Sequence, residues 1–98
     1  MIHHMFSGKL WVVNRLGGWH LITLPDNISY EIRSLANEIR PGINSIPAMI
    51  TIGNTNWKTS IFYEEAFKAY LLPVKGDVRK KEQLFIGDCI KVKLDLII

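Results

Sequence analysis

The stretch from residue 70 to residue 92 most constrains the fold, because two strands and a short helix must be connected there by tight turns. Pro73 has no backbone N–H to donate, so it belongs at the end of a strand or on a sheet edge. Asp77 is expected to cap a short basic helix over 77–82. The pair Gly87-Asp88 then indicates a turn, since glycine accepts positive φ and aspartate bonds its own backbone.

Alternation of apolar and polar residues predicts the strands. After the Gly87-Asp88 turn, Lys91, Lys93 and Asp95 separate four apolar residues, which is typical of a strand with one buried face. The apolar residues are Ile90, Val92, Leu94 and Leu96. Further strands are predicted over 6–14, 19–24, 46–52 and 57–62, with turns at 14–18 and 53–56. The strand at 19–24 is apolar on both faces and is expected to be covered on both.

One longer helix is predicted over 26–37. Its apolar residues recur at helical spacing and form one stripe: Ile28, Ile32, Leu35, Ala36 and Ile39. Asp26 or Ser29 is expected to cap it, and Arg40-Pro41-Gly42 to stop it. Leu84 and Ile86 are expected to pin the shorter helix to the core. About six short strands and two helices, without a linker, predict a small, mainly β barrel as a single domain over 1–98.

A local repeat suggests two similar halves. Leu24-Pro25 and Leu72-Pro73 each follow a predicted strand and precede a helix with an apolar-Arg pair. The distance from the proline to that pair differs by two residues between the copies. The sequence therefore predicts two approximately repeated halves.

The single cysteine, Cys89, forms no internal disulfide, which suits a reducing compartment. No run reaches the roughly 18 apolar residues of a membrane span, and no secretory signal is visible at the start. We therefore expect a cytoplasmic protein without a membrane partner. A monomer is compatible with the sequence, which does not determine the oligomeric state.

The net charge of +3 is concentrated in one region. Residues 75–93 hold six basic and three acidic side chains, which accounts for the whole excess, whereas the remaining chain holds six of each. The basic residues are Lys75, Arg79, Lys80, Lys81, Lys91 and Lys93. Such a patch can attract phosphate or an acidic partner, although a solvated face is the commoner meaning of a net charge of this size. We expect Asp88 or Glu82 to brace the Arg79 guanidinium.

Catalytic signatures are missing from the sequence. No phosphate-binding loop, dinucleotide fingerprint or nucleophile elbow occurs, and no set of residues has metal-ligand spacing, so we expect no catalytic residue, metal or cofactor. Cys89 follows Asp88, which disfavours the thiolate. His3 and His4 are expected at a frayed end. His20 lies within a strand, where a structural role is commoner than a ligand role.

Several segments together resemble the bacterial and archaeal domain-of-unknown-function family DUF1905. They run in order over 6–96: GGWHLITLP (17–25), WKTSIF (57–62), YLLPVK (70–75), VRK (78–80) and GD (87–88). The resemblance implies a double-split β-barrel, related to the AbrB, MazE and MraZ domains that bind DNA. Members of the family are often fused to a YdeI/OmdA-like bacteriocin-protection domain. The family has no established activity or site residues, and this chain departs from its relatives in the connection at 63–68.

Three hypotheses on function follow. The first is a non-catalytic binding module that contacts nucleic acid through a basic patch of Lys75, Arg79, Lys80 and Lys81. The second is a module that binds a separately encoded protein. The third is a small-ligand or enzymatic role in a pocket around Trp19, His20 and Trp57, of which both indoles are expected to be largely buried.

Overall fold

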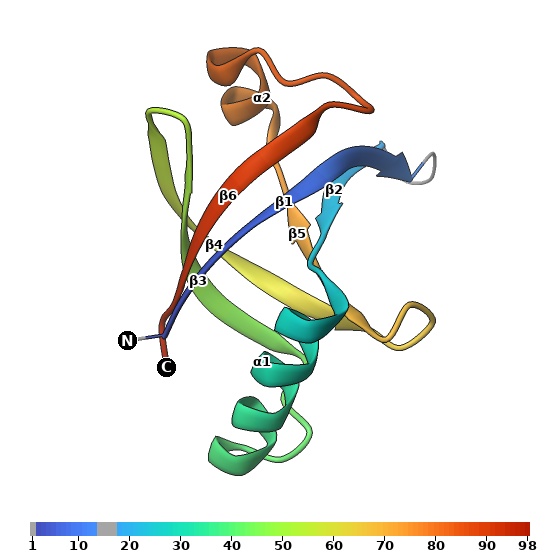
Figure 1. Ribbon diagram of the computed structural model, residues 1–98, viewed down its shortest axis with the longest axis vertical. Coiled ribbons are helices and arrows are strands. Elements are labelled where there is room, and N and C mark those ends of the chain that lie inside the picture. The colour runs from blue at the N-terminus through green and yellow to red at the C-terminus, as the bar shows by residue number, and fades with distance from the viewer. Residues whose placement is uncertain (1, 14–17) are drawn as a thin grey trace.

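A closed barrel of six antiparallel strands forms the body of the protein in the computed structural model, which describes residues 2–13 and 18–98 (Figure 1). The strands are β1 (Ile2–Val13), β2 (Trp19–Thr23), β3 (Ser45–Ile52), β4 (Thr55–Glu64), β5 (Ala69–Pro73) and β6 (Cys89–Leu96). The helices are α1 (Asp26–Ile39) and α2 (Gly76–Glu82). The predicted mainly β barrel is confirmed, whereas most of the turn predicted at 14–18 lies outside the described residues.

The barrel closes in the order β1-β2-β5-β4-β3-β6. In β6, every second residue from Ile90 to Leu96 points into the core and the residues between them point outward, as the alternation predicted. The same alternation holds in β3 from Ile46 to Ile52. β5 lies between β2 and β4, on the wall of the barrel opposite β6.

An approximate two-fold symmetry relates the two halves of the chain. Exchanging β1 with β4, β2 with β5 and β3 with β6 leaves the strand order unchanged. Aligning the two Leu-Pro pairs matches Thr23 with Leu71, and these residues face each other across β2 and β5. Aligning β3 with β6 matches Ile50 with Leu94, which also pair directly. The axis therefore passes through both pairs, as expected from the repeat.

Helix α1 covers one end of the barrel and α2 the other (Figure 1). The predicted caps of α1 are wrong: Pro25 occupies the N-cap position, so the Asp26 side chain already lies in the first turn. Ser29 is buried one turn into the helix, where its Oγ accepts a hydrogen bond from the Tyr70 N–H at 3.0 Å. That bond ties α1 to β5. Ile39, in the last turn, is exposed rather than part of the buried stripe.

Helix α2 starts at Gly76, and the Asp77 side chain makes no capping bond because it too lies inside the first turn. Leu84 packs against the core as expected, but Ile86 is 58% exposed. The reason is that the chain turns back toward β1 at this point, where the Gly87 N–H donates to the Leu10 carbonyl at 2.8 Å. The predicted Gly-Asp turn is confirmed, with Gly87 at a φ of 92°.

Candidate functional site

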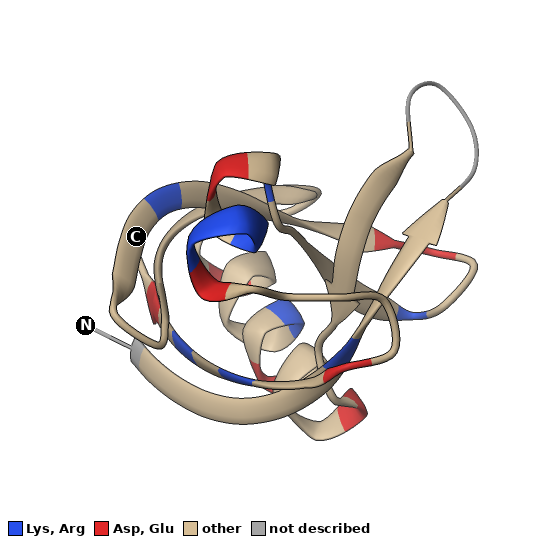
Figure 2. Cartoon of the chain, turned by 90° about the horizontal axis from the view of Figure 1, so that it is seen from above, with Lys and Arg blue, Asp and Glu red and all other residues tan. Residues whose placement is uncertain are grey.

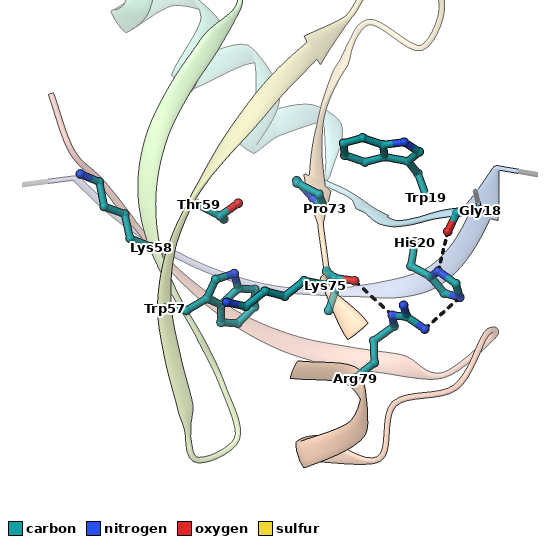
Figure 3. A pocket seen from close by; sticks show the side chains of 10 residues that line it. Gly18, Trp19, His20, Trp57, Lys58, Thr59, Pro73, Lys75 and Arg79 are labelled. Atoms are coloured by element: carbon teal, nitrogen blue, oxygen red, sulfur yellow. Dashed lines mark hydrogen bonds between the residues drawn. The ribbon is translucent and has the colours of Figure 1, made fainter. Parts of the chain in front are cut away.

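A split in the barrel wall creates a cleft that joins aromatic and basic side chains. β4 pairs with β3 along eight residues but with β5 only from Phe62 to Glu64, so β4 and β5 separate toward the α2 end. A cavity of about 380 Å³ opens at this point, and we call it the split cleft (Figure 3). Its lining residues are Gly18, Trp19, His20, Trp57, Lys58, Thr59, Pro73, Val74, Lys75 and Arg79.

The split cleft joins residues from both predicted sites. Trp19, His20 and Trp57 line it together with Lys75 and Arg79 (Figure 3). The pairing of β2 with β5 brings them together, because it places Leu21 opposite Pro73 and so sets the start of β2 beside the chain that leads into α2.

The other two predicted basic residues lie next to the split cleft. Lys80 and Lys81 line an adjacent hollow, which shares Trp57 and Lys75 with the split cleft. We call this the helix hollow. Figure 2, which views the molecule from the α2 end, shows Lys and Arg on α2 and on nearby strands. Lys58 was not predicted as a site residue, although its position in a predicted strand beside Trp57 was a usable signal.

The hydrogen bonds of His20 determine its tautomer. Nδ1 lies 2.9 Å from the Gly18 carbonyl, which can only accept, so Nδ1 carries the proton. Nε2 lies 3.3 Å from Nη1 of Arg79, which can only donate, so Nε2 is unprotonated. Through these contacts His20 helps to hold the arginine, which agrees with a structural role.

Arg79 is not braced by a carboxylate, so that expectation is wrong. Its Nε donates to the Val74 carbonyl at 3.2 Å and its Nη1 to His20, while Nη2 makes no hydrogen bond to the described residues. The two carboxylates have other partners: Glu82 accepts from the Thr55 hydroxyl at 2.6 Å and Asp88 from the Phe85 N–H at 2.8 Å. The guanidinium is thus oriented but keeps its full charge.

The cations of this region have no carboxylate partners. Across residues 2–13 and 18–98, no lysine or arginine lies within 4.0 Å of a carboxylate oxygen. The ion pairs found there join His3 to Asp95 and His4 to Glu31, so both histidines lie in β1 and not on a frayed end. Of the residues that the structure describes, no acidic one lines the split cleft, and Asp77 is the acidic residue that lines the helix hollow. A group of cations that are not paired with carboxylates favours anionic ligands.

The two indoles of the split cleft differ in exposure. Trp57 is only 9% exposed and belongs to the core, as predicted. Trp19 is 54% exposed, so the prediction of a buried side chain is wrong. Trp19 lies opposite Val13 in the pairing of β2 with β1, and neither of the two helices that the structure describes covers this part of β2 (Figure 1). Trp57 therefore forms a wall of the cleft, whereas about half of the Trp19 side chain is accessible at its surface.

Among the described residues, no three His, Cys, Asp or Glu side chains cluster as metal ligands would. Nor does this part of the chain contain a helix with the length and apolar character needed to cross a membrane.

Fold and cleft together define a small closed β-barrel whose wall splits to expose aromatic and basic side chains. Residues 6–94 match the family model of DUF1905, described as a domain of unknown function. The chain belongs to the DUF1905 family, as its motifs predicted. A search of curated proteins finds no match to it.

Proposed function

We propose that this domain is a non-catalytic binding module for nucleic acid, and that the split cleft and the helix hollow form its contact surface. One observation carries the proposal: five cationic side chains gather around Trp57 without a carboxylate partner. They are Lys58, Lys75, Arg79, Lys80 and Lys81. Phosphate contacts of this kind release condensed counterions and supply most of the affinity of non-specific nucleic-acid binding.

Arg79 and the lysines contribute differently to such a surface. The bonds from Arg79 to Val74 and His20 fix the plane of the guanidinium, and the unbonded Nη2 can then donate to a phosphate oxygen. Lys80 and Lys81 are exposed on α2 and act as mobile point charges. A binding surface with one oriented and several adaptable cations suits contacts to the phosphate backbone of a nucleic acid, which do not depend on its base sequence.

Titration of fluorescently labelled nucleic acid at two salt concentrations tests the proposal. We expect Lys80→Glu with Lys81→Glu to abolish binding at moderate salt without unfolding the protein. If residual binding is measurable at low salt, its dependence on salt should be flatter by about 0.7–0.9 units of slope for each lost phosphate contact.

The matched control is Lys91→Glu with Lys93→Glu, which makes the same change of charge. Both residues are exposed on β6, on the opposite wall of the barrel. We expect this variant to bind almost as the wild type does. Absence of wild-type binding to any nucleic acid at low salt would end the proposal and leave a partner protein as the leading hypothesis. Equal losses in both variants would show that only the net charge matters.

A further inference from the structure

We infer that the site binds single-stranded nucleic acid in preference to a duplex, an inference that rests on the proposed function. The observation is a continuous line of partly exposed aromatic rings that begins in the split cleft and follows the outer face of the barrel. We call it the aromatic track, and its residues are Trp19, Phe62, Trp11 and Phe67.

Trp19 and Phe62 make the track continuous with the cationic surface. Trp19 lines the split cleft and the two hollows that follow it along the outer face. Phe62 lines both of those outer hollows, and Lys58 lines the first of them together with the split cleft. A ligand that leaves the cations therefore meets aromatic rings without crossing an intervening element.

The far end of the track is held rigidly. The indole N–H of Trp11 donates to the Thr23 hydroxyl at 2.9 Å, so this ring has a fixed orientation. The Phe67 ring packs edge-on against it, with centroids 5.8 Å apart and an interplanar angle of 86°. Phe67 nevertheless remains 53% exposed. Rings that are already ordered lose little conformational freedom when a ligand stacks on them.

The outer face beneath the track is apolar apart from Glu64, although it lies outside the barrel core. Leu21 and Leu71 are each only 3% exposed, yet neither belongs to the core cluster. Both line the same hollow as Trp11 and Phe67. The rings therefore lie beside the buried side chains of Leu21 and Leu71, and a partner would contact the ring surface that stays exposed.

Base faces are accessible in a single strand but buried by stacking within a duplex. Aromatic side chains beside a cationic groove form the usual surface for single strands, because every base can stack and every phosphate can be neutralised. A partner protein could also cover an apolar face. This face continues directly into a group of cations that has no carboxylate partner within 4.0 Å among the described residues, which favours a polyanion with flat rings.

The test compares an oligothymidylate of about ten nucleotides, within the roughly 4–16 nucleotides that small barrels of the OB type contact, with a duplex of equal length. We expect the wild type to bind the single strand at least tenfold more tightly. Trp19→Ala should weaken single-strand binding about 5- to 150-fold, the loss expected for one stacked base, and should change duplex binding little. Trp19→Phe, which retains a ring, should recover most of the affinity.

Tyr30→Ala is the matched control, since this ring is 75% exposed on α1, away from the track. It should leave both affinities unchanged. Equal or tighter binding of the duplex, with no effect of Trp19→Ala on the single strand, would overturn the inference and leave the proposed function standing. Binding of neither ligand would instead remove the proposed function itself. In a further outcome, the wild type binds no nucleic acid but associates with another protein molecule. If Trp19→Ala then abolished that association, the aromatic track would be assigned to a protein partner.

Discussion

Replacing each cleft indole by alanine should separate the structural from the ligand-facing tryptophan. Trp57 is 91% buried within the core cluster, so truncation removes its packing and leaves a cavity. The cost should be about 3–5 kcal/mol of unfolding free energy. Trp19 has roughly half that burial and lies at the surface, where truncation opens no closed cavity. Its cost should be about 1–2 kcal/mol.

The assay is urea and thermal unfolding of both variants, followed by far-ultraviolet circular dichroism. A difference of about 2 kcal/mol corresponds to a separation of melting temperatures of roughly 8–16 °C for a domain of this size. The urea m-values should match that of the wild type, which would show that the denatured states are comparable.

The result that would refute this reasoning is a Trp19→Ala variant that loses as much stability as Trp57→Ala. Such an outcome would mean that the Trp19 ring is covered in solution, for example by a second molecule. Dilution distinguishes that case, because a covered ring would make the melting temperature depend on protein concentration. Nucleic-acid affinities of the two variants must be compared at a temperature where both are folded.

Three further changes test the packing that supports the site. Tyr70→Phe should stabilise the domain by at most about 1 kcal/mol at neutral pH, because the buried Tyr70 hydroxyl makes no hydrogen bond of 3.5 Å or less to the described residues, although the Arg33 guanidinium lies near enough to lower the pKa of Tyr70 in part. Burial raises the pKa of Tyr70, so the wild type should lose stability as the pH rises above about 10, and the variant should lack that part of the loss. Urea unfolding at a series of pH values measures both effects. A variant that is less stable than the wild type would show that the hydroxyl has a hydrogen-bond partner. Ser29→Ala should cost about 1–3 kcal/mol in the same assay, since it leaves the buried N–H of Tyr70 unpaired, and a loss below about 0.5 kcal/mol would contradict that role. Gly53→Ala should cost more than about 1 kcal/mol, because φ is 57° and the added Cβ would collide with the Glu82 carboxylate. In a double-mutant cycle, the Glu82→Ala background should remove the part of the cost that comes from this collision.

Period-two alternation made most of the barrel predictable. In β3 and β6 the side-chain direction follows directly from the pattern, so the inward set was correct at every position from Ile46 to Ile52 and from Ile90 to Leu96. The helix caps were not predictable to one residue. A shift of a single position turns a capping aspartate such as Asp26 into a first-turn residue.

The wrong predictions at the site have one physical origin: the exposure and the partners of these side chains depend on residues that are distant in the chain. An apolar face on a strand shows that burial is possible, but another element must cover it, and within residues 2–13 and 18–98 the Trp19 side chain stays half exposed. Arg79 was expected to meet nearby carboxylates, yet its partner is His20, which is 59 positions away in the sequence. The meeting of the aromatic and cationic sets depends on the pairing of β2 with β5, which local patterns do not encode.

The two halves related by the internal two-fold symmetry differ in one feature that bears on the split cleft. After Pro25 the first helix begins at once, whereas Val74 and Lys75 separate Pro73 from the second helix. Val74 enters the core and Lys75 borders the split cleft, so this two-residue insertion delivers a cation to one half alone. Such asymmetry is what a duplicated ancestral unit would acquire if one copy kept the scaffold while the other became specialised.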